Sequence, residues 1–318
     1  MSDILSITGP IYLVILVGFV VTRSGLFGRP DMRVFGKFVL NLALPALLFN
    51  ALSQRRVSDI LNHQYLAAYA LGSLLVVMAS FGWHRLVGGR SMSDCSNMAM
   101  GMACPNSGFV GYPIALLTLG ASTAGVSLAL NMMVENLFII PLLLVLSDLD
   151  SGDKGQWQTI LRQTLRSQLR NPLILAILAG MAASVLGWSL PAPLARTINL
   201  FAQASGALSL FVIGGSLVGL QVHGLKLPVA QIAVGKLLLH PLVMLAVLWW
   251  VVPVADPGLR TAVLLTSALP MMGIYTILAQ RHGHEEVASA ALLVTTLASF
   301  FSLSALLWGL GQLPGWLG

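Results

Sequence analysis

The chain has 318 residues, 57% of them hydrophobic and only 9% charged, and its mean hydropathy is +0.86. Soluble domains carry about a quarter charged residues, so this composition excludes an ordinary soluble enzyme. A helix that crosses a bilayer takes about 20 residues, so the chain has room for roughly ten to twelve spans and almost none for a soluble domain.

The charge is basic but does not indicate a nucleic-acid partner. Lys and Arg total 17 against 11 Asp and Glu, which gives a net charge of +6. These basic residues lie between apolar runs, where they act as topology signals, rather than forming a nucleic-acid-binding face. The N-terminal sequence MSDILSITGP has no basic stretch before its first apolar run, so no cleaved signal peptide is predicted. Cys95 and Cys104 are expected to be packing residues rather than a disulfide.

Apolar runs bounded by charge, glycine or proline clusters predict ten transmembrane helices. The predicted spans are 5–23, 34–52, 65–87, 94–118, 122–146, 172–189, 194–220, 228–251, 258–280 and 287–310. The predicted fold class is therefore an all-α integral membrane protein.

The basic residues predict the orientation of these spans. The loops after the odd-numbered spans hold twelve of the 17 Lys and Arg, and Lys236 lies within the eighth span. The remaining loops hold Arg55, Arg56, Arg196 and Arg260. Because cytoplasmic loops are enriched in Lys and Arg, we expect a multi-pass protein of the cell inner membrane with both termini outside the cytoplasm.

The two halves of the chain have the same arrangement of spans. Shifting the first five spans by about 165 residues overlays them on the last five. Since five is odd, the second copy crosses the membrane in the opposite sense, which is the inverted repeat typical of secondary transporters. The predicted organisation is a first repeat over 1–146, a cytoplasmic amphipathic linker over 147–171 and a second repeat over 172–318.

A proline and a glycine interrupt the fourth and ninth spans at matching positions. Pro105-Asn106-Ser107-Gly108 corresponds to Pro270-Met271-Met272-Gly273. Proline removes a backbone donor, and freed backbone groups are tolerated at membrane depth only inside protein or beside water. Two broken helices that cross would bring two half-helix N-termini together, and such ends favour anions. The alternative is that each proline is only a kink. The predicted substrate-binding residues at the breaks are Pro105, Asn106, Ser107, Gly108, Pro270, Met271 and Gly273.

The chain resembles the auxin efflux carrier family over essentially its whole length. The resemblance rests on the 5+5 spans and on three motifs, Asn41-Leu-Ala-Leu-Pro45-Ala-Leu-Leu-Phe49, Cys104-Pro105-Asn106-Ser107-Gly108 and Leu269-Pro270. It implies a fold shared with bile acid:sodium symporters, in which spans 4 and 9 cross at their prolines to form the substrate site. Bacterial members include proteins named as malonate transporters. Plant members have Asn beside both crossover prolines. Asn106 matches this pattern at the first proline, but Leu269 and Met271 flank the second, and this departure disfavours an auxin-like aromatic substrate.

Two ionisable residues lie deep within predicted spans. Glu135 follows Asn131 by one turn in the fifth span, and Lys236 precedes His240 by one turn in the eighth. A lone charge at this depth costs about 2.5–3.5 kcal/mol on insertion scales. The functional interpretation makes Glu135, with Asn131, a proton or cation site and Lys236 a counter-charge. The alternatives are a structural ion pair or a lysine that extends to the interface.

Weaker candidates lie elsewhere. Asn41 in the second span lines the predicted cavity or bonds a neighbouring helix. The His282-Gly-His284 pair is expected to be a solvated loop rather than a metal site, and no metal, cofactor or catalytic motif is predicted. In the 147–171 linker, apolar residues at helical spacing alternate with Arg162, Arg166 and Arg170, which predicts a basic helix that anchors on the cytoplasmic leaflet.

The sequence as a whole favours a secondary carrier of a small organic anion. Malonate or a similar carboxylate is the predicted substrate, bound at the crossover and carried by alternating access, with a proton or cation as a candidate co-transported ion. Direction of transport and homodimer formation stay open. One alternative is a sodium-coupled carrier of larger amphipathic anions, like the bile acid symporters. The other is an intramembrane lipid-modifying enzyme, which the absence of a recognisable nucleophile, metal cluster or acid/base pair disfavours.

Overall fold

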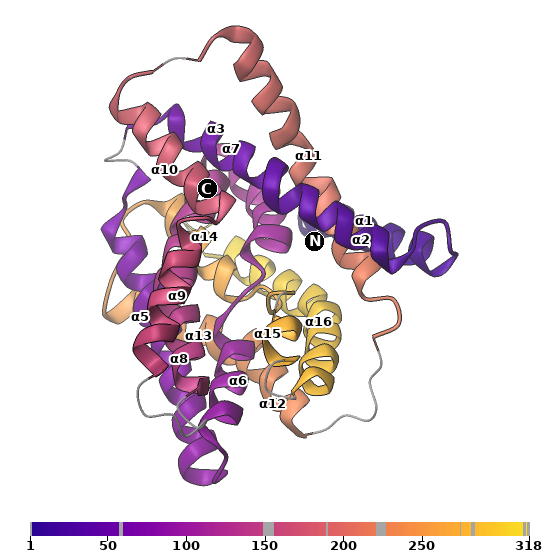
Figure 1. Ribbon diagram of the computed structural model, residues 1–318, viewed down its shortest axis with the longest axis vertical. Coiled ribbons are helices and arrows are strands. Elements are labelled where there is room, and N and C mark those ends of the chain that lie inside the picture. Colours follow the sequence, from indigo (N-terminus) through magenta and orange to yellow (C-terminus); the bar gives the residue numbers. More distant parts are fainter. Residues whose placement is uncertain are drawn as a thin grey trace.

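Helices make up all the regular secondary structure in the part of the chain that the computed structural model describes (Figure 1). It describes residues 2–56, 60–148, 156–188, 190–220, 227–273, 275–280, 284–313 and 316. Seven helical stretches there are long and apolar enough to cross a membrane, and an eighth is obtained if a bent pair counts as one span. The prediction of an all-α, multi-pass membrane protein is therefore confirmed, and the arrangement of ten spans as inverted repeats stays a prediction.

The helices pack in two groups; most of the first lies in the upper part of Figure 1 and most of the second in the lower part. The upper group comprises α1 (Ser2–Arg23), α2 (Arg29–Phe38), η1 (Val39–Ala43), α3 (Leu44–Ser53), α10 (Pro172–Val185) and α11 (Ala192–Ser216). The lower group begins with α5 (His63–Gly82), η2 (Trp83–Val87), α6 (Met92–Ala103), η3 (Ser107–Gly111), α7 (Tyr112–Val134), η4 (Glu135–Ile139) and α8 (Ile140–Asp148). It continues with α12 (Leu227–Val234), η6 (Gly235–Leu239), α13 (His240–Trp250), α14 (Pro257–Ser267), α15 (Tyr275–Gln280) and α16 (Glu285–Gly311).

Apolar side chains on the outer faces of these helices mark the surface for lipid. On α1, Leu13, Leu16 and Val17 are each more than half exposed, while Ile11 and Ile15 are buried. A helix that is apolar on all sides belongs in a core or a membrane. Both faces of α1 are apolar because one packs on α11 and the other is expected to face lipid.

Prolines explain most of the wide π-helical turns, written η here. Pro45, Pro113, Pro141 and Pro241 each lie two residues beyond the end of such a turn, namely η1, η3, η4 and η6. A proline inside a helix clashes with the carbonyl four residues earlier and removes one hydrogen bond. Widening the preceding turn relieves that clash, and such turns are frequent at functional sites. Glu135 and Lys236 both lie within these widened turns.

One long helical stretch is divided by a glycine. Ser107–Asp148 runs for 42 residues, about twice what a single crossing needs. Inside it Gly120 has φ 81° and ψ 163°, a backbone conformation that only glycine adopts readily. The sequence prediction ends the fourth span at residue 118 and starts the fifth at 122, on either side of this glycine.

Polar N-caps fix where several spans begin. Asn62, Ser91, Asn171 and Asp256 each accept a hydrogen bond from a backbone N–H in the first turn of α5, α6, α10 and α14 respectively. Such caps satisfy donors that the helix itself leaves unpaired.

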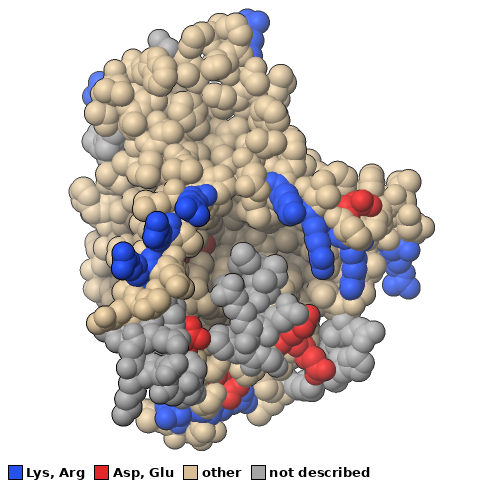
Figure 2. Space-filling view, viewed as in Figure 1, with Lys and Arg blue, Asp and Glu red and all other residues tan. Residues whose placement is uncertain are grey.

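The 147–171 linker contains one helix in its described part, α9 (Gln156–Gln168), which packs beside α8. Residues Leu161–Gln168 form with α10 the pair that is bent by 55°. Arg162 and Arg166 on α9, and Arg33 and Lys37 on α2, are exposed. Figure 2 shows Lys and Arg side chains gathered over these two helices, on either side of a hollow. Both groups belong to the loops predicted to be cytoplasmic.

Candidate functional site

The two proline-containing breaks lie against each other inside the lower group. Helix α6 ends at Ala103 and η3 begins at Ser107, while α14 ends at Ser267 and α15 begins at Tyr275. Between them, Pro105 and Met271 form an antiparallel bridge. The N–H of Asn106 donates to the carbonyl of Pro270 at 2.8 Å, and that of Met272 donates to the carbonyl of Cys104 at 3.1 Å. The backbone groups that the breaks release are thus partly satisfied by each other, as membrane depth requires.

Two glycines let the breaks approach so closely. A Cβ on Gly101 would lie 2.9 Å from Ile232 and 3.1 Å from the Met271 methyl group. A Cβ on Gly111 would lie 2.5 Å from Leu269 Cδ1. A larger residue at either position would first have to displace these side-chain ends. The two glycines therefore favour the close packing of the breaks.

Asn106 organises the start of the second half-helix. Its side-chain Oδ1 accepts from the N–H of Phe109 at 3.3 Å, and its backbone carbonyl accepts from Val110 and Gly111. This is the role of an N-cap residue. In the described part of the chain no hydrogen bond uses its amide nitrogen Nδ2. The residue is 5% exposed, so a buried donor stands at the break.

A ladder of two tyrosines holds the polar residues of the fifth predicted span. Tyr65 Oη donates to Asn131 Oδ1 at 2.7 Å, and Tyr69 Oη donates to Glu135 Oε1 at 2.6 Å. The spacing is i, i+4 in both helices, so each pair lies one turn from the next. All four side chains are buried.

The ladder contacts both breaks. Ser107 is the first residue of η3, and its Oγ donates to Glu135 Oε1 at 2.5 Å. Asn131 Nδ2 donates to Thr266 Oγ1 at 3.0 Å, in the last turn of α14. One carboxyl oxygen therefore accepts two hydroxyl protons, and the other oxygen of Glu135 can carry a proton or face a cation.

Lys236 serves the second break. Its Nζ donates to the carbonyl of Ser267 at 2.9 Å and lies 2.9 Å from His240 Nδ1. Ser267 is the last residue of α14, so the ammonium lies at the C-terminal end of a half-helix, where the helix dipole favours positive charge. Lys236 is fully buried. Among the described residues it forms no ion pair with Glu135. No direct contact therefore supports the alternative that these two residues form a structural ion pair.

The remaining predicted residues fall in different places. Met271, Pro105 and Pro270 take part in the crossover itself, and a Cβ on Gly108 would lie 3.2 Å from Leu44 Cδ1. Gly273 ends the described segment of the second break, with open space beside it.

Asn41 is exposed on η1, and its Nδ2 donates to the Lys37 carbonyl within its own helix. The structure does not bring it together with the crossover residues.

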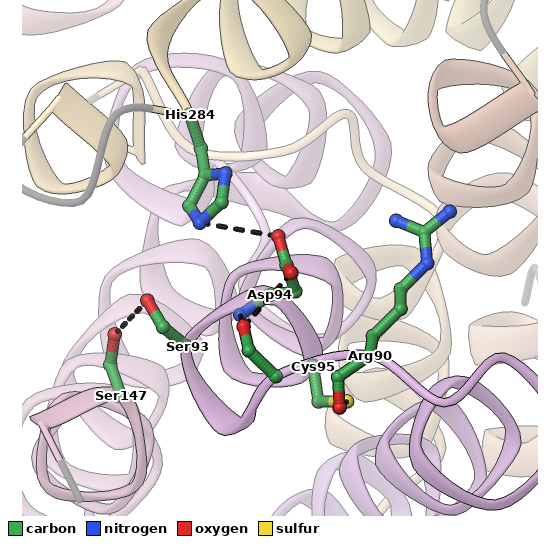
Figure 3. A network of polar contacts seen from close by, with 7 residues as sticks. Arg90, Ser93, Asp94, Cys95, Ser147 and His284 are labelled. Carbon is green, nitrogen blue, oxygen red and sulfur yellow. Dashed lines mark hydrogen bonds and ion pairs between the residues drawn. The ribbon is translucent and has the colours of Figure 1, made fainter. Parts of the chain in front are cut away.

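The loop histidine that the structure describes, His284, lies near the start of α6. Its Nε2 is 3.4 Å from Asp94 Oδ1 (Figure 3). His282 lies outside the described residues. Within the described residues no group of three or more His, Cys, Asp and Glu could hold a metal ion. Cys95 and Cys104 form no disulfide and are buried.

The sequence reasoning did not single out Tyr65, Tyr69, Thr266 and Ser267. The first two could have been found, because their i, i+4 spacing matches that of Asn131 and Glu135. Thr266 and Ser267 carry no comparable signal, since they become important only through the partners that the fold brings to them.

Apolar spans around a buried polar crossover define an integral membrane protein with a polar centre at membrane depth. The chain belongs to the family described as membrane transport protein, whose model matches residues 6–308; this is the auxin efflux carrier family that the motifs resemble. The names of the family and of the relatives indicate a transporter rather than an enzyme.

Three relatives span nearly the whole chain. A Rhizobium meliloti protein named "Putative malonate transporter" is 29% identical over 99% of this chain and 98% of its own length. An Escherichia coli protein named "Uncharacterized transporter YfdV" is 28% identical over 94% of both chains. A Methanothermobacter thermautotrophicus protein named "Uncharacterized transporter" is 23% identical over 92% of this chain and 94% of its own.

Proposed function

We propose that the chain is a secondary active carrier of small organic anions, with malonate or a similar carboxylate as substrate. The observation that carries this proposal is the pairing of two broken helices around buried polar groups. Broken helices at membrane depth are where secondary transporters bind solutes. The name of the Rhizobium meliloti relative supports a dicarboxylate.

The crossover offers an anion three kinds of stabilisation. The first N–H groups of η3, from Ser107 and Gly108, have no intrahelical acceptor, as in the first turn of any helix. Asn106 adds a buried amide donor. Lys236, whose Nζ donates to the Ser267 carbonyl, adds a positive charge beside the second break that acts on the anion at a distance and without contact. A carboxylate bound between the two breaks would face these hydrogen-bond donors, and among the described groups at the crossover only Glu135 could repel it by its negative charge.

Alternating access then follows from the two helix groups. In our proposal the breaks lie at the centre of ten spans arranged as two inverted repeats, and the upper group rocks against the lower one around the fixed site. We further propose that the chain lies in the cell inner membrane, and the positive-inside rule favours both termini outside the cytoplasm.

Coupling is assigned to Glu135. Each negative charge costs about 2.3 kcal/mol per 100 mV to bring into a negative interior, so concentrative uptake of a dicarboxylate needs a co-transported cation. Glu135 contacts the crossover through Ser107 and accepts hydrogen bonds on one oxygen only among the described residues. A proton taken from outside onto the other oxygen would neutralise the buried carboxylate while the substrate is carried inward, and it would be released inside before the return step.

Uptake by purified protein in liposomes tests the proposal. Labelled mono- and dicarboxylates are supplied while the pH gradient, the sodium gradient and the membrane potential are varied one at a time, with protein-free liposomes as control. We expect malonate to accumulate with an inward proton gradient. Accumulation that follows sodium alone, with larger amphipathic anions preferred, would support the bile acid symporter-like alternative. Failure of every carboxylate under every gradient would refute the proposal.

A further inference from the structure

Three neighbouring cavities surround the end of α3. Their volumes are about 760, 650 and 490 Å³. Arg55, which follows the end of α3, lines all three of them, and Gln54 does as well. Arg56 lines the first and the third. Arg55 therefore borders all three spaces.

The middle cavity leads toward the crossover. Its walls come from α3, α7 and α11, and it includes Leu47 and Tyr112, both almost fully buried. Tyr112 lies four residues after Gly108, and Leu47 lies three after Leu44, the residue nearest to Gly108. Since a helix rises about 1.5 Å per residue, this end of the cavity is roughly one turn from the first break. It also lies between the two helix groups, where a moving interface is expected.

The lining of this cavity mixes apolar and polar side chains, and Arg55 is the one charged side chain among its described residues. Besides Arg55 it contains amide and hydroxyl side chains. They belong to Asn50, Gln54, Ser122, Asn199, Gln203 and Ser205. Among the described residues, Asp256 is the one acid that lines any of the three, and it is confined to the largest of them. There its Oδ1 is engaged as the N-cap of α14, accepting from the Leu259 N–H at 2.7 Å.

Arg55 is not engaged elsewhere in the described structure. No ion pair or side-chain hydrogen bond of Arg55 occurs among the described residues, whereas Arg260 on the same side stacks its guanidinium 4.7 Å from the Trp316 ring. The backbone of Arg55 is held, because Ser184 Oγ donates to its carbonyl. In the proposed orientation this is the side that the topology rule leaves poor in basic residues, so membrane insertion does not require an arginine here.

We propose that Arg55 forms an outer anion-binding subsite, which takes one carboxylate group of the substrate before it reaches the crossover. This inference rests on the proposed function and deepens it. The planar guanidinium matches a carboxylate in two parallel hydrogen bonds, and the amides of Asn50 and Gln54, themselves bonded at 2.6 Å, lie beside it. A dicarboxylate has a second charged end that remains directed toward the donors at the crossover.

Transport kinetics in liposomes provide the first test. Arg55→Gln should raise the KM for malonate about tenfold, the loss expected for one charge-assisted hydrogen-bonded pair. Arg55→Lys should raise the KM less, about threefold, because the positive charge is retained while the pair of parallel guanidinium donors is lost. Arg196→Gln is the matched control, because Arg196 is exposed on the same side and lines none of the three cavities. It should leave KM unchanged.

Thiol protection tests the same subsite without transport. Both native cysteines are buried, so a cysteine introduced at Ser122, which is exposed and lines the middle cavity, reports on that cavity. Malonate should slow its modification by a membrane-impermeant thiol reagent, and Arg55→Gln should abolish the protection. A cysteine at Thr197, exposed on α11 outside the cavities, should be modified equally with and without malonate.

The outcomes separate the two proposals. Equal KM values in Arg55→Gln and the unaltered protein, with protection of the Ser122 cysteine intact in both, would overturn the outer subsite and leave the carrier function standing. If the unaltered protein moves no carboxylate, the carrier function fails, and the protection measurement still decides on Arg55 because it requires binding alone.

Discussion

The two breaks share a sequence pattern and differ in the charged side chain that attends them. At the first break, the N-terminal residue of a half-helix, Ser107, donates to the carboxylate of Glu135. At the second, the C-terminal residue of a half-helix, Ser267, accepts from the ammonium of Lys236. Each charge has the sign that the adjoining helix end favours. Two breaks with the same Pro-x-x-Gly pattern therefore differ in chemistry, because the flanking helices give them side chains of opposite charge.

This difference assigns the two breaks separate tasks. The first break carries the polar side chains Asn106 and Ser107, while the second carries Leu269, Met271 and Met272. Substrate recognition and proton coupling should therefore depend on the first break, and mechanical integrity on the anchoring of the second. Substitutions at matched positions can separate these two tasks.

The largest effect is expected at Asn106. Asn106→Ala should reduce malonate uptake about 100-fold or more, because a buried amide donor at the proposed site is lost along with the contacts it makes in the occluded state. Loss of an N-cap costs about 1 kcal/mol, so the protein should remain folded in size-exclusion chromatography. Met271→Ala, at the second break, should reduce uptake only several-fold. Equal losses at both positions would contradict the division of tasks.

Glu135→Gln should uncouple transport. The amide keeps the acceptor for Ser107 and Tyr69 but carries no titratable proton, so accumulation driven by a proton gradient should disappear while exchange of labelled for unlabelled malonate continues. Uptake by the unaltered protein should rise as the outside is acidified, since a proton must load the carboxylate, and the variant should show a flat profile. A variant that still accumulates malonate with the same pH dependence would remove Glu135 from the coupling step.

Lys236→Met should lower stability more than selectivity. The change leaves the buried carbonyl of Ser267 without its donor, at a cost of about 1–3 kcal/mol. Thermal unfolding in detergent should report a lower midpoint, and the KM for malonate should change little. Lys37→Met is the control, because Lys37 is exposed on α2. If Lys236→Met instead raises KM strongly without a stability loss, Lys236 contacts the substrate directly.

The breaks themselves could be predicted from sequence, because proline acts through local backbone geometry that needs no knowledge of neighbours. The widened turns could have been predicted as well, since a proline follows most of them two residues later. Glu135 and Lys236 were recognisable as costly residues at membrane depth.

The partners of these residues could not be predicted in the same way. That Glu135 bonds Tyr69 and Lys236 bonds Ser267 depends on which helices lie side by side and on their rotation, which single spans do not encode. Asn41 illustrates the limit from the other direction, because its motif indicated a cavity role and the structure has its side chain bonded within its own helix. Arg55 was counted only as a topology signal, since three separate helix ends create the space around it.

The smallest effect is expected where the start of α16 meets the first broken helix away from the crossover. His284 lies before α16, and its Nε2 is 3.4 Å from Asp94 in the first turn of α6. Both side chains are partly exposed, and ion pairs of this kind contribute about 0–1 kcal/mol. His284→Ala should therefore keep malonate uptake within about twofold of the unaltered protein, with Asp94→Asn giving the same result. A loss comparable to that of Asn106→Ala would mean that transport also depends on the contact between α16 and the first broken helix, and the functional difference would no longer be confined to the buried breaks.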